Sequence, residues 1–327
     1  MLKKTIVRAT MVAAALLPLA TISVSAQDAA TYPDHPVTII VPYSPGGSTD
    51  AAARFIAPLL SEALGQPFVV ENKPGASGTI GTDAVAKADN DGYTLLVHTS
   101  VIGIHPAFKS NLTYDTQADL SPVSVVAGGP FVLNVNPSVP ANTVAELVDY
   151  AKAHPGELNF GSAGAGSSGH LIAELFMEST GIDMVHIPYA GGGPSQVGLM
   201  SNEVQLVFDT LTSVPFIEEG RLKALAVTSN ERWAGLPDVP TMKEQGYEDS
   251  AAAIWIGAFA PAGTPQEIVD KLSANIAKAV EDKKVVDQLY GVGLVPVGST
   301  PAEAKTTLDT DIAKWKALAA SGVTLEQ

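Results

Sequence analysis

Short β-branched segments alternate with helically spaced apolar positions in the first part of the chain, as expected of parallel strands joined by helical crossovers. The segments that predict strands here are Val37–Val41, 68–71, 93–97 and 123–127. Ser48–Leu64 has the spacing of an amphipathic helix, and Gly65 is suited to cap its C-terminus. The Gly128-Gly129-Pro130 sequence then interrupts the pattern.

The same alternation resumes after this break and continues for about a hundred residues. The elements predicted in this second series are strands 131–135, 158–161, 184–187, 205–208 and 222–227 and helices Val144–Ala153, 171–178 and 195–200. They form a self-contained α/β unit. A loop-forming region containing Pro237, Pro240 and Gly246 follows it.

The last part of the chain predicts a strand, 254–260, followed by the long helices Gln266–Glu281 and Pro301–Ala320. These helices need a sheet to cover, and the first strands of the chain have too few helices for their two faces. We therefore expect an α/β fold of two domains, each a mainly parallel sheet flanked by helices. Domain 1 comprises 27–129 and 254–327, and domain 2 comprises 130–253. Two crossings between them would form a hinge and a cleft. A single large doubly wound sheet is the alternative.

The first 26 residues have the features of a secretory signal peptide, with basic residues at 3, 4 and 8, an apolar run over 9–22 and small residues at 24–26. The apolar run is short for a membrane span of about 20 residues, and Pro18 interrupts it. We therefore expect a periplasmic protein. Removal of the signal makes the chain more acidic than its formal charge of -15, which argues against nucleic acid as a partner. The chain has no cysteine, so a lipid-anchored cysteine and disulfides are excluded.

Loop 1, residues 43–50 (Tyr-Ser-Pro-Gly-Gly-Ser-Thr-Asp), joins a predicted buried strand to a helix. In parallel α/β sheets, ligands bind at the carboxyl ends of strands, where this loop lies. Its glycines allow the backbone to approach a ligand, and the free N–H groups of the first helical turn attract anions. Ser48 or Thr49 is a candidate N-cap, and either hydroxyl can cap the helix or contact the ligand.

Loop 2, residues 161–170 (Gly-Ser-Ala-Gly-Ala-Gly-Ser-Ser-Gly-His), also joins a strand to a helix. It offers backbone N–H groups and serine hydroxyls to one small volume. The glycines at 164, 166 and 169 match the dinucleotide pattern GxGxxG, but a lone match is weak. Asp183 has nearly the spacing of the ribose-binding acid, yet it precedes its strand and would lie at the wrong edge of the sheet. No lysine follows the glycines as a P-loop requires.

A serine nucleophile in loop 2 is a further alternative. The GxSxG elbow fails at Ser168 because the second glycine position is His170. His170 can still pair with a neighbouring serine, although a histidine at a helix start is more often a cap or a ligand donor.

Loop 3, residues 189–194 (Tyr-Ala-Gly-Gly-Gly-Pro), again lies between a strand end and a helix. Tyr189 can bring its ring and hydroxyl to the cleft or pack against the hinge. Asp209 follows a strand and so points to the same rim, where its carboxylate can bind a water or a ligand amine or hydroxyl, or cap the next helix. The six histidines show no metal-ligand spacing, and no EF-hand loop is present, so we expect neither a metal nor a cofactor.

The chain resembles the substrate-binding proteins of tripartite tricarboxylate transporters, the Bug family. The resemblance covers essentially the whole mature chain and rests on motifs that occur in this order: YPDHPVTIIVPYSPGGSTD, VVENKPGASGTIG, DGYTLL, YAGGGP, VFDT, LPDVPTMKEQGY and APAGTP. It implies a periplasmic two-domain binding fold with two crossing strands. It also implies a membrane permease as the partner to which solute is delivered.

In that family, loops equivalent to loops 1 and 2 hold the proximal carboxylate of the ligand, largely through backbone N–H groups and bridging waters. Carried over to this chain, the ligand-binding residues are Tyr43, Gly47, Ser48, Thr49, Asp50, Thr99, Ser100, Ala165, Gly166, Ser167, Ser168, His170, Tyr189, Gly192 and Asp209. The arginines of the mature chain, at 54, 221 and 232, lie outside the loops, so an arginine clamp is not expected.

We therefore expect a monomeric, non-enzymatic binding protein for a small dicarboxylate or tricarboxylate, aromatic acid or amino acid. An exported Ser/His hydrolase or another enzyme that uses loop 2 is the alternative function. A sensor that reports its ligand to a membrane receptor would use the same cleft.

Overall fold

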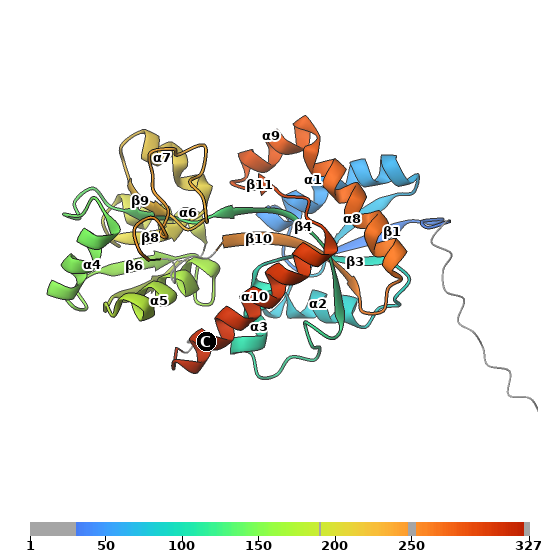
Figure 1. Ribbon diagram of the computed structural model, residues 1–327, viewed down its shortest axis with the longest axis horizontal. Helices are drawn as coiled ribbons and strands as arrows, with labels where there is room; N and C mark the ends of the chain where they lie inside the picture. The colour runs from blue at the N-terminus through green and yellow to red at the C-terminus, as the bar shows by residue number, and fades with distance from the viewer. Residues whose placement is uncertain (1–30, 190, 248–252, 324–327) are drawn as a thin grey trace, which may run out of the picture.

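The protein consists of two α/β bodies joined by long strands (Figure 1). The computed structural model describes residues 31–189, 191–247 and 253–323, and the expected signal peptide lies outside the described residues. The strands form a six-stranded and a five-stranded sheet, so the alternative of one doubly wound sheet is wrong. The first sheet is built from the two ends of the chain and the second from the middle, as the two-domain interpretation expects.

The six-stranded sheet has the order β11-β4-β10-β3-β1-β2. Its strands are β1 (Val37–Val41), β2 (Phe68–Asn72), β3 (Thr94–Thr99), β4 (Leu120–Pro130), β10 (Ala253–Pro261) and β11 (Val295–Pro296). The helices of this body are α1 (Ser48–Leu64), α2 (Thr79–Ala86), α3 (Val101–Phe108), α8 (Gln266–Glu281), α9 (Lys283–Gly291) and α10 (Pro301–Ala320), and η1 (Ala76–Gly78) precedes α2.

Helices cover both faces of this sheet, which explains why its inner strand β1 is apolar almost throughout. In β1, Val37, Ile39 and Val41 pack in the core cluster that contains the buried faces of α1, α8 and α9. Ile40 points the other way, into the cluster formed with α3 and α10. The expected cover of the sheet by C-terminal helices is confirmed.

The five-stranded sheet has the order β7-β6-β8-β5-β9. Its strands are β5 (Val132–Val135), β6 (Asn159–Ser162), β7 (Val185–Pro188), β8 (Leu206–Asp209) and β9 (Lys223–Val227). Its helices are α4 (Val144–Ala153), α5 (Ser168–Thr180), α6 (Gly192–Met200) and α7 (Val214–Glu218), with the short η2 (Leu211–Ser213) after β8. Leu206 and Phe208 pack in the cluster with α4 and α5, whereas Val207 packs in the cluster with α6.

Both sheets are mixed, so the expectation of mainly parallel sheets is wrong in this detail. β10 runs antiparallel to β3 and β4, because the chain leaves the first body through β4 and returns through β10. β4 and β10 pair from Leu120↔Pro261 to Pro130↔Ala253, so the two crossings form one antiparallel ribbon. In the second body, β5 continues the chain from β4 and runs antiparallel to both β8 and β9.

Helix α10 extends from the first body toward the second (Figure 1). It begins with a capping box, in which Thr300 and Glu303 satisfy each other's backbone N–H groups. Leu308 and Ile312 pack on the first sheet, while Trp315 near its end joins the core cluster of the second body. Among the helices in the described ranges, none is long and apolar enough to cross a membrane.

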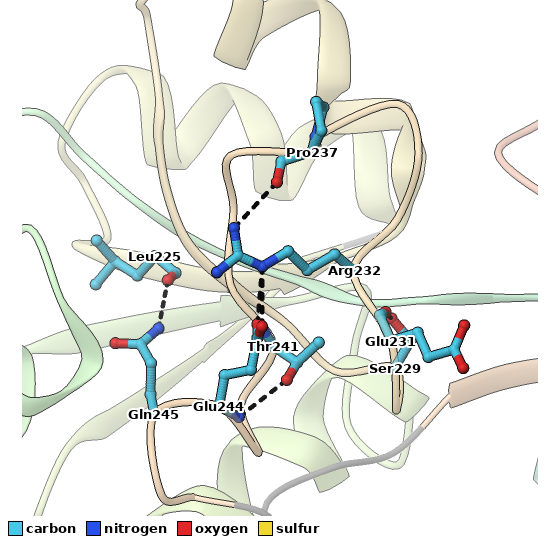
Figure 2. A network of polar contacts seen from close by, with 8 residues as sticks. All are labelled: Leu225, Ser229, Glu231, Arg232, Pro237, Thr241, Glu244 and Gln245. Atoms are coloured by element: carbon cyan, nitrogen blue, oxygen red, sulfur yellow. Dashed lines mark hydrogen bonds and ion pairs between the residues drawn. The ribbon is translucent and has the colours of Figure 1, made fainter.

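Residues 228–247, which follow β9, are held by a polar network (Figure 2). The Arg232 side chain donates to both carboxylate oxygens of Glu244 and to the Pro237 carbonyl. Glu244 also accepts from the Thr241 backbone N–H, and Thr241 forms a bridge with Val227 at the end of β9. Arg232 therefore has a structural role outside the predicted ligand loops.

Candidate functional site

Loop 1 is fixed from behind by the buried carboxylate of Asp50. Its oxygens accept hydrogen bonds from the Gly46 backbone N–H (2.9 Å), the Arg54 Nε–H (2.9 Å) and the Asn72 amide (2.9 Å). Burial opposes ionisation, but these hydrogen bonds hold the pKa of Asp50 below its ordinary value. Gly46 has φ +93°, a left-handed conformation that favours glycine. Asp50 thus positions the loop.

The N-terminus of α1 is left open to the cleft by this arrangement. Its N-cap residue is Gly47, which has no side chain to cap the helix, so the N–H groups of the first turn remain available to a ligand. Tyr43 stands at the start of the loop, and burial raises the pKa of its hydroxyl to about 12. Its phenol therefore stays protonated at neutral pH and can donate a hydrogen bond.

Loop 2 presents the N-terminus of α5 to the same space. Ser167 is the N-cap residue, and its hydroxyl accepts a hydrogen bond from the His170 backbone N–H at 3.4 Å. Gly169, in the first turn of the helix, has no room for a side chain, because a Cβ there would lie 2.7 Å from the carbonyl oxygen of Phe208. The absence of that Cβ lets the start of α5 approach the end of β8.

His170 supports loop 2 from inside the protein. Its Nδ1 accepts from the Gly166 backbone N–H (3.0 Å), and its Nε2 faces a Glu174 carboxylate oxygen (3.3 Å). The ring stacks on His186 with centroids 3.9 Å apart, and His186 Nε2 contacts Ser162 Oγ at 2.7 Å. Burial lowers the pKa of His186 to about 4, so its ring is neutral at neutral pH. Both ring nitrogens of His170 are thus engaged away from the loop 2 hydroxyls of Ser167 and Ser168.

Loop 3 and Asp209 complete the wall contributed by the second sheet. Gly191 has φ +122° and leads into α6, so a third helix N-terminus faces the cleft. One Asp209 carboxylate oxygen accepts from the Thr210 backbone N–H at 2.7 Å, and the other has no partner among the described residues. Only 7% of Asp209 is exposed, and burial raises its pKa to about 6.

These loops surround one cavity of about 930 Å³ between the two sheets, which we call the first cavity. The predicted site residues that line it are Tyr43, Gly47, Ser48, Thr49, Thr99, Ser167, Ser168, Gly192 and Asp209. They come from the carboxyl ends of β1, β3, β6, β7 and β8, the edge of the sheets where a ligand is expected. Their contacts with a ligand stay a prediction.

The other predicted site residues do not line the first cavity. Asp50 and His170 are buried behind their loops, and Ser100 is the buried N-cap residue of α3. The Tyr189 hydroxyl packs against α6, where a Cβ on Gly198 would lie 2.2 Å from it. Ala165 and Gly166 line a different, second cavity.

Sequence reasoning missed a wall of the first cavity that comes from the C-terminal part of the chain. The turn between α9 and β11, residues 291–294, lines the cavity opposite the second sheet. Gly293 has φ +74°, and a Cβ on it would lie 3.2 Å from both the Thr212 side chain and the Thr212 backbone nitrogen. The Gly-Val-Gly sequence indicates a turn, but nothing local indicates that it reaches the second body.

The first cavity has little positive charge of its own. Among the described residues that line it, none is lysine, arginine or histidine, and Asp209 is the one carboxylate. The attraction for an anion must therefore come from backbone N–H groups and the N-termini of α1, α5 and α6. No group of three or more His, Cys, Asp or Glu side chains that could hold a metal occurs among the described residues.

Comparison with known proteins agrees with this architecture. The chain is 40% identical over 288 residues to Protein BugT of Bordetella pertussis, covering 87% of this chain and 88% of BugT. It is also similar to a solved TctC solute-binding protein from Polaromonas, with a TM-score of 0.81, 32% identity, and coverage of 89% of this chain and 99% of that one.

Two further solved structures contain ligands according to their descriptions. R. palustris Rpa4515 with adipate is 38% identical, with a TM-score of 0.74 and coverage of 89% of this chain and 98% of that one. MatC (Rpa3494) from Rhodopseudomonas palustris with bound malate is 32% identical, with a TM-score of 0.72 and coverage of 88% and 100%. The profile of the tripartite tricarboxylate transporter family receptor matches residues 52–322. The chain belongs to that receptor family.

Proposed function

We propose that this protein is exported to the periplasm, captures a small carboxylate in the first cavity, and delivers it to a membrane permease of the tripartite tricarboxylate type. The observation that carries this proposal is the convergence of three helix N-termini on a cavity that has no cationic side chain among its described lining residues. Such an arrangement suits an anion that is bound mainly by backbone groups.

The binding energy is divided between the two bodies. Loop 1 belongs to the first body, whereas loops 2 and 3 belong to the second, so each body contributes at least one helix N-terminus. One such terminus stabilises an anion by about 0.3 to 2 kcal/mol, and a carboxylate that reaches both bodies gains from both. We propose that this shared contact favours closure about the β4–β10 ribbon, with domain boundaries near residues 129 and 254.

Asp209 lines the same cavity as the proposed anionic ligand, so its own negative charge would oppose binding. Its pKa of about 6 allows it to take up a proton when a carboxylate binds nearby. Once protonated, its free oxygen can donate a hydrogen bond to the ligand. Alternatively, the ionised form can accept one from a hydroxyl group, an amine or a water. Asp209 therefore influences which carboxylates bind, and its own carboxyl group does not exclude an anionic ligand from the cavity.

The hydrolase alternative has weaker support from the contacts of the histidine it would use. A Ser/His mechanism needs the imidazole to take a proton from a serine hydroxyl. His170 has its ring nitrogens directed to Gly166 and Glu174, and Ser167 Oγ meets only its backbone N–H. The Ser162–His186 contact lies under loop 2, where Ser162 is only 1% exposed. A binding role fits these contacts better.

Thermal denaturation in the presence of a carboxylate series tests the proposal. Adipate and malate, the ligands named for two relatives, head the series, and the corresponding amides serve as matched controls without charge. A ligand at about 100 times its dissociation constant adds about 2.7 kcal/mol of stability. We expect at least one acid to raise the melting temperature and its amide to leave it unchanged. Equal shifts with acid and amide, or ester hydrolysis without any shift, would overturn the proposal.

A further inference from the structure

The β4–β10 ribbon separates two cavities that lie between the bodies. On β10, Ile254 lines the first cavity, whereas its neighbours Ala253 and Trp255 line a smaller cavity of about 300 Å³, which we call the back cavity. Successive side chains of a strand point to opposite faces, so the two cavities lie on opposite faces of the ribbon. The back cavity is also lined by both bodies, through Thr228 after β9 and Thr310 on α10. A rotation about the ribbon that narrows the first cavity therefore widens the back cavity.

On the side of the first cavity, the two bodies touch beside the ribbon. A Cβ on Gly293, in the 291–294 turn of the first body, would lie 3.2 Å from both Cγ2 and the backbone nitrogen of Thr212 in η2 of the second body. A Cβ on Gly129, in the crossing strand β4, would lie 3.4 Å from the Gly293 carbonyl oxygen and 3.7 Å from Leu211 Cδ1. Gly293 and Thr212 both line the first cavity, so their contact tightens when that cavity narrows.

The 291–294 turn is attached firmly to the helix that begins at loop 1. Leu294 is 1% exposed and packs in the same core cluster as Ile56 of α1 and Leu289 of α9. Val292 packs against this cluster from the side of the turn. The turn therefore moves as one unit with the N-terminus of α1.

The other partner in the contact, η2, is attached equally firmly to the second body. The Gln196 amide of α6 donates to Thr212 Oγ1 at 3.0 Å, and the Asn134 amide of β5 donates to Ser213 Oγ at 3.0 Å. The contact at Gly293 thus joins two rigid units. It fixes the separation between the N-terminus of α1 in one body and the N-termini of α5 and α6 in the other.

We propose that the contact between Gly293 and Thr212 is the stop that sets how far the two bodies close on a ligand. This inference rests on the proposed function, because the separation that the stop sets is the one that a bound carboxylate must span. Glycine at position 293 lets closure proceed until backbone N–H groups of both bodies reach the same ligand. A side chain at this position would halt closure earlier and leave one body out of reach.

The test must separate the added bulk from the effect on the backbone, because Gly293 has φ +74°. Gly65, the C-cap residue of α1, has the same φ of +74° and no described atom within 4 Å of a Cβ built on it. Asparagine tolerates this left-handed conformation better than most residues. Gly293→Asn and Gly65→Asn therefore make the same backbone change, and only the first adds an obstacle between the bodies.

Calorimetric titration with adipate and with malate measures the consequence for binding. We expect Gly293→Asn to bind either acid about two- to thirtyfold more weakly than wild type, which is the contribution of one helix N-terminus to the binding of an anion. Gly293→Ala adds less bulk and should lose less affinity, and it serves as the second variant if the asparagine variant does not fold. Gly65→Asn should bind as wild type does.

The separation of the bodies is measured by pulsed electron paramagnetic resonance between two spin labels. The chain has no cysteine, so Val197→Cys on α6 and Lys284→Cys on α9, both at exposed positions, give unique labelling sites. Helices α6 and α9 reach the first cavity from opposite bodies, so closure shortens this separation. The shortest separation should be longer in Gly293→Asn than in wild type, both with and without acid.

The combined results distinguish the stop from other effects of the substitution. Unchanged separation in the Gly293 variants would overturn the inference, even if binding is weaker, because the new side chain would then only block the cavity. Equal loss of affinity in Gly65→Asn would also overturn it. If wild type binds neither acid, the proposed function fails, and the separation measured without acid still decides whether the stop exists.

Discussion

Replacing Asp209 by asparagine tests how the first cavity accommodates a carboxylate of its own. The substitution retains the shape of the side chain and an oxygen that can accept from the Thr210 backbone N–H. It removes the ionisable group, whose second oxygen has no partner among the described residues. The variant should therefore lose the cost of burying a charge while keeping the local hydrogen bond.

The magnitude of this effect follows from the pKa of Asp209, which burial raises from 3.8 to about 6. A difference of that size corresponds to about 3 kcal/mol, because each unit is worth about 1.4 kcal/mol. The carboxylate ionises in the unfolded chain at lower pH than in the folded chain. The destabilisation is therefore complete above about pH 6 and absent below about pH 4, and stability falls as the pH rises between them.

Urea unfolding of wild type and Asp209→Asn across this pH range measures the effect. The free energy of unfolding of the variant should exceed that of wild type by about 3 kcal/mol near pH 7, and the pH-dependent excess should disappear near pH 4. Asp149→Asn, on the exposed side of α4, controls for the loss of one negative charge. A difference between variant and wild type that does not change with pH would refute this interpretation of Asp209.

Further predictions concern the loops that form the cavity. Ser167→Ala removes the α5 cap and should cost about 1 kcal/mol of stability in urea unfolding. Calorimetry should find that carboxylate binding is weakened but still present. Complete loss of binding would refute a site built mainly from backbone groups. Gly169→Ala forces a Cβ against the Phe208 carbonyl and should destabilise by about 1 to 3 kcal/mol, whereas Gly193→Ala, with no atom within 4 Å of its Cβ, should not; equal effects would contradict the close approach of α5 and β8. Hydrogen bonds keep the pKa of Asp50 below 3.8, so its contribution to stability should be present at neutral pH and lost in acid, and Asp50→Asn should remove that acid-dependent loss in unfolding titrations.

Long periodic segments were predictable because their pattern is set by burial. Helices α1, α4, α8 and α10 have the bounds that the spacing of apolar residues predicts. Helices α2, α3 and α9 were not predicted, because the first two are short and have weak patterns. Helix α9 has only nine residues, and it follows α8 directly after Asp282. The antiparallel direction of β10 was also not predictable from the local sequence. It depends on the direction of β3 and β4, the earlier strands between which β10 inserts.

Some features of the candidate site were likewise predictable from local sequence, whereas others depend on tertiary packing. Loops 1, 2 and 3 were found because glycine-rich turns between strands and helices occupy the carboxyl edge of a sheet. Asp50 and His170 belong to those loops in sequence, but their side chains turn inward to hold the backbone. The 291–294 turn reaches the cavity only through tertiary packing, and no motif could have identified it. Sequence patterns therefore predicted which loops line the first cavity better than which of their side chains face it.

A crystal structure of the mature chain with a bound carboxylate such as adipate is the most direct test of the central claim. We predict that one carboxylate group lies in the first cavity, within hydrogen-bonding distance of backbone N–H groups at the N-termini of α1 and α5, and so contacts both bodies at once. A ligand with no carboxylate in the first cavity, or whose carboxylate there contacts one body alone, would contradict the account.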